Sequence, residues 1–138
     1  MTTMFRRIVV RDGGQATAFT VVMTLAVLAL AGLVLDAGLA VSTKVEAVSV
    51  AQAAARAGAR ELDVAALRAT GVVRVDPAKA RAAAQDWLAR AGLPGTVSVT
   101  GNQVSVSVTT SQPTQLLHLI GIASIPITAG ATADAIAP

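Results

Sequence analysis

The sequence predicts an α+β fold in which a long N-terminal transmembrane and stalk helix is followed by a small head with one helix and a short antiparallel sheet. Three observations predict this arrangement. Residues 13–35 carry no charge, residues 36–62 continue with helical spacing and no proline, and valines alternate with serine and threonine over residues 96–110. The 138 residues are therefore expected to form one folded domain attached to a long helix.

The uncharged run is long enough to cross a membrane, because a spanning helix needs roughly 20 apolar residues at about 1.5 Å each. A secretory signal has a shorter apolar region, of roughly 7–15 residues, before its cleavage site. We therefore expect an uncleaved transmembrane helix over residues 16–35. A cleaved signal ending near Ala40 remains the alternative, because Gly38-Leu39-Ala40 is a tolerable cleavage site.

Basic residues precede the apolar run. The leader, residues 1–15, contains Arg6, Arg7 and Arg11 against Asp12 alone. By the positive-inside rule this leader is cytoplasmic. The net charge of +3 lies largely at this end, so a nucleic-acid partner is not expected.

Everything after the run is then extracytoplasmic. We expect a stalk helix over residues 36–62 and a small α+β head over residues 63–138. The stalk has small or apolar residues at heptad-like spacing, with charged residues on the opposite face. This stripe predicts contact with a neighbour, either the chain's own head or another helix, and it comprises Val41, Val45, Val48, Ala55, Ala59 and Leu62.

The head begins with a well-marked helix. Asp76 suits the N-cap, Pro77 suits the first helical position, and Gly92 closes the far end. Trp87 is the only tryptophan, and we expect it to pack against the sheet.

The sheet follows the helix. Two alternating runs meet at Gly101-Asn102, which predicts a hairpin with one apolar face. A short helix opened by Pro113 comes next. The segment after Ser124 predicts a third strand, and Pro126 favours an edge position for it.

The sequence gives little support to catalysis or to cofactor binding. Cysteine is absent, which excludes disulfides, thiol catalysis and cysteine-ligated metals. His118 is the only histidine, and no serine or acid is tied to it by spacing. We expect neither an enzyme nor a metal or cofactor site.

Two stretches resemble a known family. "LVLDAGLAV" followed by "AQAAARAGA" is similar to the N-terminal module of the Flp pilus-assembly TadE/TadG-like proteins, in which one apolar helix leads into an Asp-x-Gly pair, here Asp36 and Gly38. The resemblance implies a single-pass membrane accessory component of Flp/Tad-type pilus assembly or a related secretion apparatus. Its implied partners are the lipid bilayer, other pilus or secretion-system membrane proteins, and further copies of the chain.

The sequence also departs from that family. Gly14 is the position where prepilin-type processing would cut, but Phe19 then occupies the fifth mature position, where pilins and TadE-type pseudopilins carry glutamate. Gln52 stands where the family usually has aspartate, and Arg56 where it often has leucine. We therefore expect neither processing nor polymerisation as a pilin.

Two hypotheses remain open. Asp36 either pairs with a partner group at the membrane or marks the outer interface, where water reaches it, and we favour the second. As a whole, the chain is either the membrane component described above or a secreted small binding module released by cleavage near Ala40. The head has few residues for a core without disulfides, so support from the stalk favours the membrane component.

Overall fold

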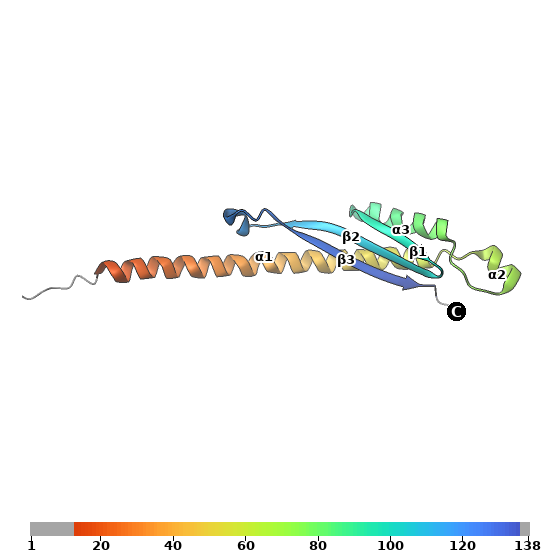
Figure 1. Ribbon diagram of the computed structural model, residues 1–138, viewed down its shortest axis with the longest axis horizontal. Coiled ribbons are helices and arrows are strands. Elements are labelled where there is room, and N and C mark those ends of the chain that lie inside the picture. Colours follow the sequence, from red (N-terminus) through yellow and green to blue (C-terminus); the bar gives the residue numbers. More distant parts are fainter. Residues whose placement is uncertain (1–12, 136–138) are drawn as a thin grey trace, which may run out of the picture.

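The computed structural model describes residues 13–135 and shows a small head built on the second half of one long helix (Figure 1). The fold class agrees with the sequence-based prediction. In chain order the elements are α1 (Gly13–Ala59), α2 (Val64–Thr70), α3 (Pro77–Ala91), β1 (Gly95–Thr100), β2 (Gln103–Pro113), the 3₁₀ helix η1 (Leu117–Ile120) and β3 (Ser124–Asp134).

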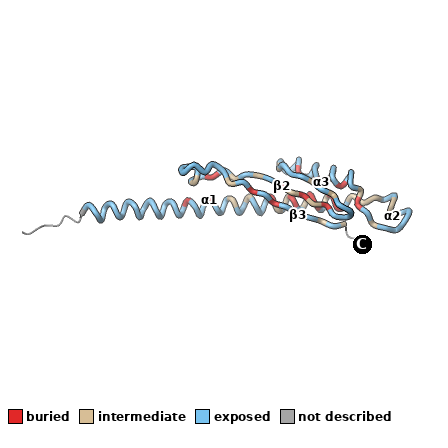
Figure 2. The backbone as a smooth tube through the Cα atoms, in the orientation of Figure 1, coloured by how far each residue is buried: buried red, intermediate tan, exposed pale blue. Residues whose placement is uncertain are grey.

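Helix α1 is continuous because its residues include no proline and are mostly alanine, leucine and valine. Its N-terminal half projects alone and is exposed almost throughout, whereas its C-terminal half lies under the head (Figures 1 and 2). Within the described residues, α1 is the one helix that is long and apolar enough to cross a membrane. The basic leader falls almost entirely outside the described residues.

The three strands form an antiparallel sheet in the order β1-β2-β3. Gly101, with φ of 59°, turns the chain between β1 and β2, as the sequence predicted. Alternation then sorts the side chains: Val104, Val106 and Val108 are buried, while the other face carries serine and threonine. The third strand is confirmed at the sheet edge, with Pro126 opposite Ser111.

Helices α1 and α3 cover the apolar face of the sheet. Most of the core comes from small side chains, which let backbones approach closely. Gly58 shows this best, since a Cβ atom there would lie 2.9 Å from the Ala80 carbonyl oxygen and 3.0 Å from the Val104 side chain. The buried alanines that α1 contributes to this core are Ala47, Ala51, Ala54, Ala55 and Ala59.

Helix α3 has the predicted ends. The Asp76 carboxylate accepts hydrogen bonds from the N–H groups of Ala78 and Lys79, at 3.1 and 3.2 Å. Pro77 begins the helix, and Gly92 ends it with φ of 67°. These local signals were sufficient to place the helix.

The expectation that Trp87 packs in the core is wrong, because 43% of its surface is exposed. The buried stripe of α3 is narrower than expected and consists of Ala80, Ala84 and Leu88. Leu88 reaches the start of β1, where it contacts Gly95. Trp87 lies one position to the side of this stripe.

One additional helix and two element boundaries differ from expectation. The head contains a second helix, α2, whose N-cap Asp63 accepts a hydrogen bond from the Ala66 N–H at 3.0 Å. Pro113 ends β2 instead of opening a helix, and the short 3₁₀ helix starts at Leu117. Helix α1 ends at Ala59, so Leu62 lies beyond it and forms a β-bridge with Val75.

Candidate functional site

Asp36 joins the exposed, apolar half of α1 to the head. It follows directly on the expected transmembrane segment 16–35, yet only 1% of its surface is exposed. Its carboxylate accepts hydrogen bonds from three consecutive backbone N–H groups in the loop between β2 and β3. These donors are Gln115 at 2.8 Å, Leu116 at 3.0 Å and Leu117 at 2.8 Å.

This arrangement favours the ionised carboxylate. The hydrogen bond from Leu117 is the main cause that lowers the pKa of Asp36, burial opposes it, and the bonds from Gln115 and Leu116 lower it further. The expectation that water reaches Asp36 is wrong, because only 1% of its surface is exposed. Its partner is a loop of the same chain. Asp36 supplies acceptors for N–H groups at the start of η1, where a helix has no acceptors of its own.

Gly32 lies one helical turn before Asp36, and the side chain of Leu116 from the same loop packs against it. A Cβ atom at Gly32 would lie 2.6 Å from Cδ1 of Leu116, so a larger residue would push the loop away. Spacing of four residues places Gly32 and Asp36 on one face of α1. The sequence contains this glycine and aspartate pair, but a helix-to-loop contact has no local sequence signal.

Three further hydrogen bonds hold the loop and the adjoining end of β2 in position. The Thr114 N–H donates to the Ala123 carbonyl at 3.1 Å, and the Thr114 hydroxyl donates to the Ile122 carbonyl, so the base of the loop is closed. Nearer the sheet, the Thr43 hydroxyl of α1 donates to Gln112 at 2.6 Å. The loop is thus attached to α1 on one side and to its own strands on the other.

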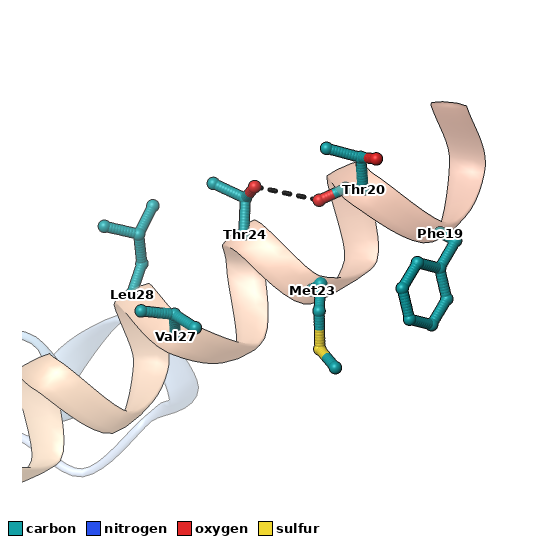
Figure 3. A pocket seen from close by; sticks show the side chains of 6 residues that line it. All are labelled: Phe19, Thr20, Met23, Thr24, Val27 and Leu28. Atoms are coloured by element: carbon teal, nitrogen blue, oxygen red, sulfur yellow. Dashed lines mark hydrogen bonds between the residues drawn. The ribbon is translucent and has the colours of Figure 1, made fainter. Parts of the chain in front are cut away.

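The remainder of the apolar half of α1 has no enclosed site. An open hollow of about 410 Å³ runs along its first turns and is lined only by residues of this helix (Figure 3). Figure 3 shows the side chains of Phe19, Met23 and Val27 pointing outward. The Thr24 hydroxyl donates to the Thr20 carbonyl at 2.8 Å, so this polar group is satisfied within the helix. Such a surface suits lipid tails.

The predicted stalk face does not act as one surface within the chain. Ala55 and Ala59 are buried against the head, and Val48 is partly buried beside them. Val41 and Val45 are 63% and 64% exposed. The C-terminal part of the stripe, from Val48 on, therefore contacts the chain's own head. The N-terminal part, Val41 and Val45, is not covered by the head. Leu62 is partly buried beyond the end of the helix.

The remaining candidates are exposed. Gly14 and Gly38 have open space around their Cα atoms. Gln52 and Arg56, which depart from the family pattern, lie on the exposed side of α1. His118 is exposed in η1, and among residues 13–135 no group of three or more histidine or acidic side chains could hold a metal ion.

Comparison with known proteins finds a family similarity for α1. Residues 14–61 match the model of a family described as "Putative Flp pilus-assembly TadE/G-like", and the matched segment includes Asp36, Gly38 and all but the first residue of α1. No match was found among curated proteins or among solved structures. The segment similar to this family thus coincides with the helix that is long and apolar enough to cross a membrane.

Proposed function

We propose that this chain is a single-pass membrane accessory component of Flp/Tad-type pilus assembly, or of a related secretion apparatus, that holds its small head at the membrane surface. The observation that carries the proposal is the continuity of α1. One half of this helix is bare and apolar, and the other half supplies buried alanines to the head. A head that shares its core with the anchor stays at a fixed distance from the bilayer.

Orientation follows from the leader. Arg6, Arg7 and Arg11 favour a cytoplasmic N-terminus, which leaves the head extracytoplasmic. The exposed start of the stalk, with Val41 and Val45, then lies close to the extracytoplasmic face of the membrane that α1 spans. It is the part of α1 that a neighbouring subunit could contact.

The secreted-module alternative has less support. Cleavage near Ala40 would separate Asp36 from the three N–H groups that it binds and would remove Gly32 from contact with Leu116. The head would lose the support of its β2–β3 loop. A signal segment destined for removal has no reason to bind the mature domain in this way.

The proposed role can be tested by deleting the gene in the producing organism and measuring Flp pilin sheared from the cell surface by immunoblot. We expect surface pilin to fall and to be restored by the full-length chain. A chain whose residues 13–35 are replaced by a cleavable signal peptide should not restore it. Unchanged surface pilin in the deletion strain would contradict the assembly role.

A further inference from the structure

The loop between β2 and β3 exposes an unusual amount of apolar surface. Leu119 and Ile120 are 74% and 72% exposed, and Leu116 and Ile122 are also exposed. Contiguous apolar residues at the tip of a hairpin are unfavourable in water and typically mark a contact with a membrane or a partner. The neighbouring sheet face, in contrast, is lined by serine and threonine.

The position of this loop is fixed relative to the apolar helix. Loop residues Leu117, Leu119 and Ile120 share a hollow of about 440 Å³ with Leu28 and Leu33 of α1. Figure 1 shows the loop beside α1 at the end of the head that faces the bare half of the helix. With a rise of about 1.5 Å per residue, residues 28–35 correspond to roughly the last 10 Å of the expected span. If α1 spans a bilayer over residues 16–35, the loop therefore lies at the depth of acyl chains.

The backbone of the loop is also suited to lipid, where unsatisfied polar groups are costly and must find partners within the protein. Asp36 accepts from three of its N–H groups, and its own charge is thereby hydrogen-bonded. Further N–H groups donate to carbonyls within the loop and its base, and these belong to Thr114, Leu119, Gly121 and Ile122.

We propose that residues 116–122 insert into the leaflet on the head's side of the membrane, with Leu119 and Ile120 in contact with lipid acyl chains. The head then touches the bilayer at two points, α1 and the loop, and cannot rotate freely about the helix. Lipid is the expected occupant because the exposed loop surface is continuous with the exposed apolar surface of α1. This inference rests on the proposed insertion of α1.

The absence of cysteine allows a direct test with single spin labels. Full-length Ile120→Cys, Val27→Cys and Ser98→Cys variants would each carry a nitroxide in phosphatidylcholine–phosphatidylglycerol vesicles. All three positions are exposed, so the label should not disturb the fold. Electron paramagnetic resonance would compare the accessibility of each label to oxygen, which concentrates in lipid, and to a water-soluble nickel chelate.

We expect the label at Ile120 to resemble that at Val27, with high oxygen and low nickel accessibility, and the label at Ser98 to show the reverse. A water-like signal at Ile120 with a lipid-like signal at Val27 would overturn loop insertion and leave the transmembrane helix intact. Low accessibility to both reagents at Ile120 would mean that protein covers the loop, which also overturns the proposal. A water-like signal at Val27 would overturn the transmembrane assignment itself.

Discussion

A matched pair of glycine substitutions tests the packing of the head on α1. Gly58 and Gly38 both lie inside α1, but a Cβ atom at Gly58 would come within 2.9 Å of the Ala80 carbonyl oxygen, whereas at Gly38 no atom lies within 4 Å. Alanine in place of glycine stabilises an exposed helix interior by up to about 1 kcal/mol. Forcing an extra carbon into a tight contact costs about 1–3 kcal/mol.

Both variants gain the same helix-propensity term, so the difference between them isolates the steric cost. We expect Gly38→Ala to raise the free energy of unfolding above that of the unaltered chain. The free energy of unfolding of Gly58→Ala should be about 1–3 kcal/mol lower than that of Gly38→Ala. Denaturant titration in detergent micelles, followed by the fluorescence of Trp87, would measure both values. Equal stability of the two variants would refute the close approach of α1, α3 and β2 at Gly58.

Three further predictions concern the site and the stalk. Asp36→Asn should increase cleavage of the β2–β3 loop by chymotrypsin at neutral pH, whereas the exposed Asp86→Asn should not. Because the pKa of Asp36 is lowered on folding, its contribution to stability should be complete above the unfolded pKa of about 3.9 and be lost as the pH falls toward the folded pKa. Loop cleavage by pepsin, which is active at acid pH, would check this loss. Val104→Ala should cost about 2–3 kcal/mol of unfolding free energy because the side chain is fully buried, whereas Val45→Ala should cost less than about 0.5 kcal/mol, as denaturation curves would show. Val41→Lys combined with Val45→Lys should leave folding and membrane insertion unchanged but reduce co-purification of partner subunits, and normal recovery would count against a stalk contact.

Local signals in the sequence predicted most of the elements correctly. Asp76, Pro77 and Gly92 act through bonds to their near neighbours, so the ends of α3 could be predicted without knowledge of the rest of the fold. Valine alternation around Gly101 predicted the hairpin for the same reason. The same kind of signal, Asp63 before and Gly71 after a short run, marks α2, although the sequence-based prediction missed it.

Contacts between distant segments could not be predicted in this way. The donors to Asp36 come from residues that lie far along the chain, and no pattern near Asp36 indicates them. The second half of α1 has alanines on several faces, so periodicity alone could not select the face that packs on the sheet. That face includes Ala51 and Ala54, neither of which belonged to the predicted stripe.

The most direct test of the retained transmembrane helix is the intact mass of the chain recovered separately from membranes and from culture medium. The proposed membrane role predicts a full-length chain in the membrane fraction, and a chain trimmed after Gly14 would also retain the helix. A chain in the medium that begins near Val41 would contradict it, because the apolar segment would then be a removed signal and Asp36 would be absent from the mature protein.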